Sequence, residues 1–532
     1  MLPKDTVLPS PRFASLSGAR LFDFSSAISR IEAGLDRVGQ IGYLTLDFFR
    51  ALPQRPFGVQ AIIDQFDGVG YRSLNVVSLT AIFSGMVLAL QMGQFLARFG
   101  AKIYVSRVMG ISLLRELGPV LTALMIGARV GAGISAELGT MKVTDQIDAM
   151  RALGASPVKE LVVPRVLATV LMLPVLTVIA DLVGLIGGWL IALTQLGVTS
   201  NYFYTSLMRN LMVRDLVSGL GKSTVFGFLI GIVACQMGLS ARGGRWSWAR
   251  DDLRGRDRID KHPGFRLLPD ETVPGTLMDS REKEPFISIR GLYRSFGSKH
   301  VLRGIDLEVM AGETIVVLGG SGEGKSVLLR HINGLERPDA GEVRVEGQNL
   351  NLLSEEELAP IRTRVAMVFQ QGALFDSLSV YDNVAYPLRK HGWRDEGRIG
   401  DRVREVLAMV DLPETGHLYP AELSGGMRKR VAIARALALA PQAVLFDEPT
   451  AGLDPIVGFK ILHVIRELQK KLGLTSVLVT HDLRSALYVG DRFALLDKGR
   501  IRFVGSAVEL QQSRDELVRQ FIASSFGEGA AA

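Results

Sequence analysis

The sequence predicts an α-helical membrane domain followed by a soluble α/β domain, and two observations carry that prediction. Of the 532 residues, 48% are hydrophobic and 22% are charged, which is too apolar for an ordinary soluble enzyme and too mixed for a pure membrane bundle. The long apolar stretches all lie in the first half of the chain, whereas the second half alternates strand-like and helical runs. At about 150 residues per domain, the length predicts two to four domains.

Composition also excludes several classes of protein. The single cysteine, Cys235, cannot form an internal disulfide or a multi-cysteine metal site, so a disulfide-stapled secreted protein is excluded. The net charge of +7 fits a membrane protein at least as well as a nucleic-acid binder. Six arginines lie together between residues 242 and 258, so we predict no nucleic-acid partner.

Four apolar stretches are long enough to cross a hydrocarbon core of about 30 Å. They cover residues 76–97, 117–134, 165–209 and 223–241. The second is broken by Arg129, and the third contains Asp181. The length of the third permits one long tilted helix or a helix followed by a re-entrant turn. Starting inside, four spans return the chain to the cytosol, where the arginines of the next segment satisfy the positive-inside rule.

The segments around these spans have a different character. We expect residues 1–33 to form a flexible tail, without a cleavable signal peptide. Residues 34–66 predict an interfacial amphipathic helix, with a cytosolic helix packed on the next domain as the alternative. The membrane domain then covers residues 34–243, and the polar, arginine-rich segment 244–284 predicts a linker.

The soluble domain is expected over residues 285–510, with a C-terminal helix and tail over 511–532. Five strand-like runs lie at 287–289, 314–318, 365–369, 443–446 and 476–479. A glycine-rich loop follows the second run and opens a helical run. In that position the loop amides converge on phosphate oxygens, a lysine reaches the terminal phosphates and a serine hydroxyl binds Mg²⁺. The loop consists of Gly319, Gly320, Ser321, Gly322, Glu323, Gly324, Lys325 and Ser326.

Two acidic residues, Asp447 and Glu448, directly follow the strand-like run 443–446. Asp447 is placed to bind Mg²⁺ directly or through water, and Glu448 is placed to polarise an attacking water. An apolar run that ends in two acidic residues is common by itself. Its position after a phosphate loop makes it informative.

The pentapeptide 423–427, Leu-Ser-Gly-Gly-Met, is similar to the signature motif of ATP-binding cassette (ABC) ATPases, and the other motifs of that family are present over about 286–510. Each residue alone has an ordinary reading, such as a surface histidine or a loop amide, so the resemblance depends on their order and spacing. It implies an α/β P-loop domain of the ABC ATPase type with ATP and Mg²⁺ as cofactors. The residues that match the family's motifs are Gln370 (catalytic and Mg²⁺-binding), Asp454 (D-loop), His481 (switch histidine), Phe296 (adenine stacking) and Ser424, Gly425 and Gly426 (signature).

The same resemblance implies a homodimer in which Ser424 and Gly426 of one copy close over the ATP held by Lys325 of the other. Closure of that sandwich would drive transport, and Glu448 and His481 would complete the hydrolytic site.

The first half resembles the MlaE permease family over about residues 35–243. The matching strings lie at 113–120, 127–129, 135–139, 154–157 and 164–165. The resemblance implies a multi-pass protein of the inner membrane with a cytoplasmic ATPase of the MlaF type. It also implies an Mce-type periplasmic partner and the movement of phospholipids or other hydrophobic molecules.

Residues 137–150, between the second and third spans, predict one amphipathic helix outside the bilayer. Met141, Asp145 and Asp148 would share one face, with Val143, Ile147 and Met150 near another. In an ABC permease this element would be the coupling helix that docks on the ATPase domain; an ordinary cytosolic loop helix is the alternative.

Three ionisable residues lie at or within the apolar segments, namely Glu116, Arg129 and Asp181. A charge there is costly unless it is paired or hydrated. These groups could line a path for a lipid headgroup or fix the packing of the helices, and the sequence offers no partner for Asp181.

The junction departs from the permease family. After residue 244 the family's last transmembrane helix is missing. Reading one base later from Trp246, the codons permit the family's string and a largely apolar run, with a stop codon that overlaps the codon of Met278. We therefore hypothesise that a frameshift joined adjacent permease and ATPase genes, with a natural linker as the alternative.

These observations predict a half-transporter that combines permease and ATPase and moves a lipid with ATP. Two alternatives stay open: a membrane-anchored ABC ATPase with a role outside transport, and a non-functional fusion product.

Overall fold

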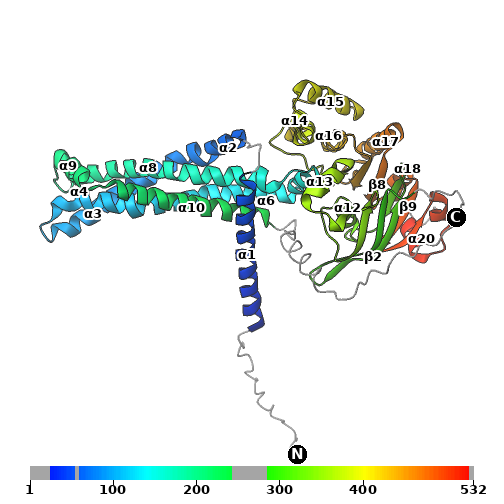
Figure 1. Ribbon diagram of the computed structural model, residues 1–532, viewed down its shortest axis with the longest axis horizontal. Coiled ribbons are helices and arrows are strands. Elements are labelled where there is room, and N and C mark those ends of the chain that lie inside the picture. Colours follow the sequence, from blue (N-terminus) through cyan, green and yellow to red (C-terminus); the bar gives the residue numbers. More distant parts are fainter. Residues whose placement is uncertain (1–23, 54–58, 242–283, 527–532) are drawn as a thin grey trace, which may run out of the picture.

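The structure is a computed structural model that describes residues 24–53, 59–241 and 284–526. The first 23 residues of the predicted tail, all but the last residue of the predicted linker, and the frameshift hypothesis for that linker lie outside the described residues. Figure 1 shows a long helical bundle, the membrane domain, whose end abuts an α/β domain.

Four helical segments are long and apolar enough to cross a membrane within the described part of the chain, as the sequence predicts. They cover Val59–Ala97, Lys102–Val143, Val158–Thr194 and Val213–Leu239. The first contains α2 (Val59–Phe66) and α3 (Arg72–Ala97); the second contains α4 (Val105–Ser112), α5 (Gly118–Ile126) and α6 (Ala132–Val143); the third contains α8 (Val163–Thr194); the fourth is α10 (Val213–Leu239).

Within these segments, single π-helical turns connect α-helices at Asp67–Tyr71, Leu113–Leu117 and Gly127–Gly131. A fourth π-helical turn, Val158–Val162, leads directly into α8. The stretch 165–209, for which two readings were open, is one long helix that ends at Thr194, followed by a separate short helix, α9 (Ser200–Asn210).

The single helix predicted over residues 34–66 is wrong. Helix α1 (Phe24–Ala51) ends two residues before Pro53, which lacks the amide donor that a continuing helix needs. Helix α2 then continues into the first spanning segment. Figure 1 shows α1 lying across the bundle near the α/β domain. It buries Leu44 and Phe48, while Leu35 and Val38 are exposed; its position at a membrane surface remains a prediction.

Small residues let the spanning helices approach closely. A Cβ atom on Gly85 of α3 would lie 1.9 Å from the carbonyl oxygen of Gly184 on α8. A Cβ atom on Gly227 of α10 would lie 2.6 Å from the carbonyl oxygen of Thr169, also on α8. Backbone-to-backbone packing at small residues is typical of helices in lipid, where no hydrophobic effect drives them together.

The α/β domain contains two sheets. The smaller is antiparallel, in the order β2-β1-β4-β5, and the larger has the order β10-β9-β3-β8-β7-β6. In the larger sheet the neighbours of β3 and β7 are all parallel to them, and β10 alone pairs in the antiparallel sense. The strands are β1 (Ile287–Phe296), β2 (Lys299–Val309), β3 (Thr314–Leu318), β4 (Ala340–Val345), β5 (Gln348–Asn349), β6 (Val365–Val368), β7 (Ala443–Asp447), β8 (Thr475–Thr480), β9 (Arg492–Asp497) and β10 (Arg500–Gly505).

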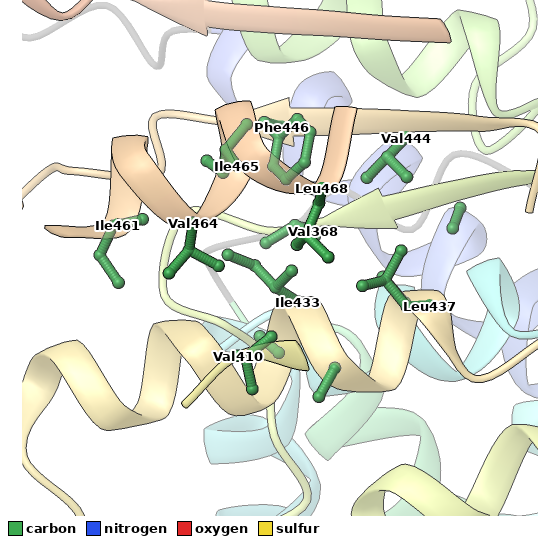
Figure 2. Packing of buried hydrophobic residues seen from close by; sticks show 14 of the residues in the cluster. Val368, Val410, Ile433, Leu437, Val444, Phe446, Ile461, Val464, Ile465 and Leu468 are labelled. Carbon is green, nitrogen blue, oxygen red and sulfur yellow. The ribbon is translucent and has the colours of Figure 1, made fainter. Parts of the chain in front are cut away.

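Nine helices of the described residues accompany these sheets. They are α12 (Lys325–Ile332), α13 (Glu355–Arg364), α14 (Val380–Lys390), α15 (Glu396–Met409), α16 (Gly425–Leu437), α17 (Pro455–Leu472), α18 (Leu483–Val489), α19 (Ala507–Gln511) and α20 (Glu516–Phe526). Figure 2 shows the core between sheet and helices, where Val368 and Phe446 of the sheet face Ile433 of α16 and Ile465 of α17. Strands β3 and β7 are buried along their whole length. Their carboxyl ends therefore hold the residues that follow them in fixed positions.

Candidate functional site

The glycine-rich loop lies between β3 and α12, as the sequence predicts for a phosphate loop. Gly322 and Gly324 have φ angles of 81° and 104°, which favour glycine. The Lys325 side chain is buried, and its Nζ donates to the carbonyl oxygens of Gly319 at 2.9 Å and Gly320 at 2.8 Å. The lysine is thus held inside the loop that it follows.

The two predicted Mg²⁺ ligands from the loop and from β7 lie side by side. The Ser326 hydroxyl donates to Asp447 Oδ1 at 2.8 Å. Asp447 is 5% exposed, and this burial raises the pKa of its carboxyl, against the opposing effects of the Ser326 hydrogen bond and of Arg330. A hydroxyl and a carboxylate that touch in this way suit a hard cation that takes its remaining ligands from phosphates and water.

Glu448 joins the same site. Its backbone has a φ angle of 43°, an uncommon conformation for a residue other than glycine. Its Oε1 lies 3.5 Å from Lys325 Nζ, and its Oε2 lies 3.3 Å from His481 Nδ1. The structure therefore brings Lys325, Glu448 and His481 together, although their catalytic roles remain predictions.

The sequence analysis missed Lys429, which connects two of the predicted residues. Its Nζ donates to the backbone carbonyls of Gln370 and Glu448, the latter at 3.2 Å. Burial lowers the pKa of Lys429 to about 8. Gln370 itself follows β6 and is exposed. The sequence signal that could have pointed to Lys429 is its position two residues after the signature motif. Its partners could not be predicted, because they come from loops that are far away in the sequence.

The signature segment at the start of α16 packs against the D-loop and the start of α17. Ser424 caps α16 by accepting from the Met427 amide at 3.3 Å, and Asp454 caps α17 by accepting from the Val457 amide at 3.0 Å. A Cβ atom on Gly426 would lie 2.4 Å from Val457 Cγ1, and one on Gly425 would lie 3.1 Å from Leu453 Cδ2. The hydrogen bonds described for Ser424 do not reach the phosphate loop.

Phe296 ends β1 and is half-buried. The guanidinium of Arg294 lies 4.9 Å from the centre of its ring. Arg294 is itself held by Glu336 at 2.8 Å and Asp339 at 3.2 Å. The sequence analysis did not find Arg294, because these three partners converge only in the folded domain.

The segment between the second and third spans is not the single helix that the sequence predicted over residues 137–150. Helix α6 ends at Val143, Asp145 has a left-handed φ angle of 58°, and a new helix, α7 (Gln146–Ala152), begins after it. The break rotates the later residues, so the predicted faces are wrong. Met141 packs inside the membrane domain, whereas Asp145 and Asp148 face the α/β domain.

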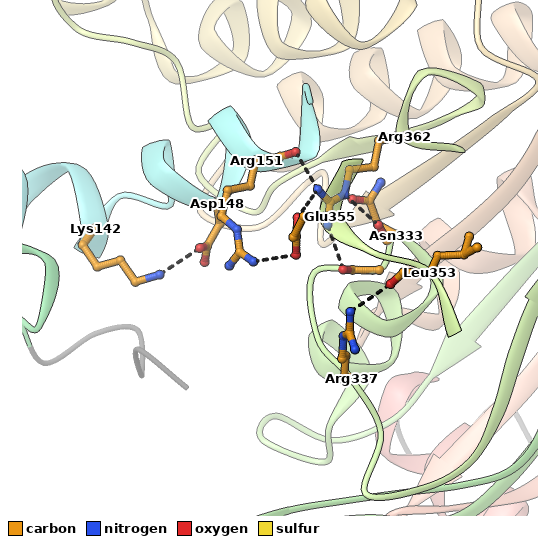
Figure 3. Close-up of polar contacts among 9 residues, drawn as sticks. Lys142, Asp148, Arg151, Asn333, Arg337, Leu353, Glu355 and Arg362 are labelled. Atoms are coloured by element: carbon orange, nitrogen blue, oxygen red, sulfur yellow. Dashed lines mark hydrogen bonds and ion pairs between the residues drawn. The ribbon is translucent and has the colours of Figure 1, made fainter. Parts of the chain in front are cut away.

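Helix α7 docks on the α/β domain through both apolar and polar contacts. Ala149 and Ala152 are part of that domain's buried core cluster. Arg330 of α12 pairs with Asp145 at 2.9 Å and with Asp148 at 3.2 Å. Figure 3 shows the polar network, whose described bonds include Lys142–Asp148 at 2.8 Å, Arg151–Glu355 at 3.1 Å and Arg362–Glu355 at 2.8 Å.

Further contacts involve the first residue of α7 and the residues that follow this helix. Gln146 donates to Asp376 at 2.8 Å, Lys390 pairs with Glu160 at 2.5 Å, and His391 Nε2 lies 3.0 Å from the Leu153 carbonyl oxygen. Helices α12, α13 and α14 of the α/β domain thus all contribute to the docking surface.

The ionisable residues of the membrane domain have different surroundings. Glu116 pairs with Lys222 at 2.7 Å, and Arg129 donates to the Arg72 carbonyl. Asp181 is 4% exposed and lies against Gly118, and its Oδ1 has no partner among the described residues. The sequence analysis also missed a pair between helices, Arg165 with Glu137 at 2.6 Å.

A phosphate loop joined to two strand-end carboxylates, docked on a bundle of four apolar helices, defines an ATPase attached to a membrane domain. Comparison with known proteins gives the families. The model of the family "Permease MlaE" matches residues 62–252, and that of "ABC transporter" matches residues 302–451.

Curated relatives match the ATPase. A probable ribonucleotide transport ATP-binding protein, mkl, of Mycobacterium leprae is 41% identical over 236 residues, which are 44% of this chain and 68% of that one. A methionine import ATP-binding protein, MetN, of Rhizobium etli is 44% identical over 218 residues, which are 41% of this chain and 60% of that one. A dimeric structure of the cassette MJ0796 is 34% identical, with a TM-score of 0.39, over 41% of this chain and 98% of that one.

The chain belongs to the ABC transporter family. It combines an MlaE-type permease domain and an ATP-binding, ATP-hydrolysing cassette in one polypeptide, and it is a multi-pass membrane protein.

Proposed function

We propose that this protein uses ATP to move a phospholipid or a similar hydrophobic molecule across or out of the inner membrane. The observation that carries the proposal is the docking of α7 on the cassette. Arg330, which holds Asp145 and Asp148 of the permease domain, lies on the helix that begins at Lys325 of the phosphate loop. A change at the nucleotide can therefore move the membrane domain directly, which is what coupling requires.

The class of cargo is inferred from the MlaE family match. Its resemblance to lipid-transporting permeases also suggests an Mce-type periplasmic partner. The membrane domain exposes large apolar side chains on its spans, such as Phe83, Val87 and Leu124.

We propose that two copies act together, through both the cassette and the permease domains. Ser424 and Gly426 lie at the start of α16, next to the D-loop and outside the hydrogen bonds of the phosphate loop. A second copy would bring its signature residues over the ATP held by Lys325, with Asp454 at the contact and the adenine stacked on Phe296.

Hydrolysis would use the cluster at the carboxyl end of β7. Ser326, Asp447 and Gln370 would hold Mg²⁺, which supplies charge neutralisation at the phosphates when it is bound. Glu448 would orient and polarise the attacking water, with His481 at 3.3 Å to stabilise the charge that develops. The buried Lys325 ammonium would neutralise the terminal phosphates.

The test is the ATPase activity of the full chain reconstituted in nanodiscs. The discs are compared across sets whose phospholipids carry different headgroups. We expect activity to rise severalfold with the transported lipid, and we expect the Asp145→Asn/Asp148→Asn variant to lose this stimulation while it retains basal hydrolysis. Basal activity that is indifferent to every lipid and to this variant would instead support a membrane-anchored ATPase outside transport. A chain that fails to insert into membranes would support a non-functional fusion.

A further inference from the structure

We propose that Arg330 is a positioning residue that links the cation end of the nucleotide site to the permease domain, so that docking of α7 sets the affinity of the cassette for Mg²⁺. This inference rests on the proposed coupling function and adds a mechanism and a sign to it.

The first observation is the geometry of α12. Ser326 and Arg330 are four residues apart on this helix, so they lie on one face, one turn apart. Ser326 bonds Asp447 at 2.8 Å, and Arg330 bonds Asp145 and Asp148 of the permease domain at 2.9 and 3.2 Å. One helix face therefore carries the predicted Mg²⁺ ligand at one end and the permease contact at the other.

The second observation is the charge balance along this face. The Arg330 side chain is 24% exposed, and its guanidinium lies among carboxylates from both domains. Burial lowers the pKa of Arg330, but Asp148, Asp145, Glu336 and Asp447 together outweigh it, so the pKa rises. Arg330 thus places one positive charge between the two permease carboxylates and the end of α12 that carries Ser326.

The third observation is that Asp148 has another partner on its own domain. Lys142 pairs with Asp148 at 2.8 Å, and both side chains are buried. Asp145, in contrast, has Arg330 as its ion-pair partner in the described structure. Its left-handed backbone at the break between α6 and α7 fixes the carboxylate toward α12.

These contacts predict that charge removal in the cassette and charge removal in the permease domain change the Mg²⁺ affinity in opposite directions. Removing the charge of Arg330 takes a repelling cation away from the Mg²⁺ site, so Mg²⁺ should bind more tightly. Removing the charges of Asp145 and Asp148 leaves Arg330 less neutralised, so Mg²⁺ should bind more weakly. Coupling between binding sites is reciprocal, so Mg²⁺ must in turn change the strength of α7 docking.

The experiment measures, by calorimetric titration without turnover, the free Mg²⁺ concentration that half-saturates the reconstituted full chain loaded with a non-hydrolysable ATP analogue. The Mg²⁺ concentration for half-maximal ATPase activity is measured beside it. We expect Arg330→Gln to lower the half-saturating concentration and Asp145→Asn/Asp148→Asn to raise it. Each shift should be roughly three- to tenfold, because the charges lie within about two helical turns of the Mg²⁺ site and are partly screened. In the Arg330→Gln background the aspartate changes should lose most of their effect. Arg330→Lys, which keeps the charge, should remain near the parent value.

Lys390→Gln is the matched control, because it breaks the Lys390–Glu160 pair of the same interface, away from α12 and from the carboxylates that pair with Arg330. It should leave the Mg²⁺ dependence unchanged. Shifts of equal sign for the Arg330 and aspartate variants, or an equal shift for Lys390→Gln, would show that docking acts only as a structural contact and would overturn the inference. Loss of lipid stimulation in the parent protein would contradict the proposed function but would leave these shifts measurable.

Discussion

The cassette and the membrane domain organise their polar residues in opposite ways. In the cassette, Ser326, Asp447 and Glu448 are local neighbours of buried strands, and each has a partner within 3.5 Å. In the membrane domain, Glu116 meets Lys222 and Glu137 meets Arg165 from distant helices. The site residues of the cassette therefore lie within short sequence motifs. The polar contacts of the membrane domain instead join different spans.

The difference extends to packing. Strand β3 is buried along its whole length in a core of branched side chains, where the hydrophobic effect supplies the stability. Helices α3 and α8 meet backbone to backbone at Gly85 and Gly184. The two domains should consequently be destabilised by different substitutions.

Glu448→Gln should have the largest effect on activity, because it removes the carboxylate that we propose polarises water. We expect ATP hydrolysis to fall by about 10²–10³-fold, the size seen when one preorganised catalytic group is removed, while ATP binding and membrane insertion persist. Steady-state hydrolysis and binding of a fluorescent ATP analogue measure these quantities. Glu356→Gln on the exposed side of α13 is the control and should leave both unchanged.

Gly85→Leu should damage the membrane domain selectively. The new side chain would overlap the Gly184 carbonyl, since even a Cβ atom would lie 1.9 Å from it. Overpacking of this kind costs about 1–3 kcal/mol and can exceed that at a backbone contact. The thermal midpoint of the detergent-solubilised chain should fall. Gly221→Leu on α10, where a Cβ would meet nothing within 4 Å, should fold normally; equal damage from both would contradict the packing account.

Acid should weaken the cassette through His331. Burial lowers the pKa of this histidine from 6.5 to about 4, and its Nδ1 donates to the Val327 carbonyl at 2.7 Å. Between these pH values the unfolded chain binds more protons than the folded chain, so the free energy of unfolding falls as the pH falls. At pH 5 the loss should be about 2 kcal/mol relative to pH 7.

The pH dependence of thermal unfolding checks this prediction. His331→Gln keeps a donor for Val327 without a titrating group, so its unfolding midpoint should change less between pH 7 and pH 5. Identical pH profiles for the parent and the variant would show that His331 does not control the acid response.

Phe296→Ala should have the smallest effect among these changes. Loss of a stacked base contact costs about 1–3 kcal/mol, and at the lower end this weakens ATP binding about fivefold. Phe296→Tyr should retain the affinity. An unchanged apparent affinity in the alanine variant would place the adenine elsewhere.

The sequence predicted the cassette site more completely than the membrane domain. The phosphate loop and the Asp447–Glu448 pair could be proposed because both lie at the carboxyl ends of buried strands, and the structure brings them together. Lys429 and Arg294 were missed, because their partners come from distant segments.

The limits of sequence reasoning are clearest between the domains. Within the described residues, the number of candidate spans agrees with the prediction, because length and apolarity decide it. The helix over 137–150 was wrong, because periodicity does not reveal a left-handed residue such as Asp145. Arg330 passed unnoticed, because its role exists only where α7 meets α12.

The central claim is that one chain couples ATP hydrolysis to lipid movement through α7. The most direct test is ATP-dependent transfer of a fluorescent phospholipid between reconstituted vesicles and acceptor particles. We predict transfer by the parent chain, and we predict that the Asp145→Asn/Asp148→Asn variant loses transfer while it still hydrolyses ATP. Hydrolysis without any transfer by the parent chain, or full transfer by the variant, would contradict the account.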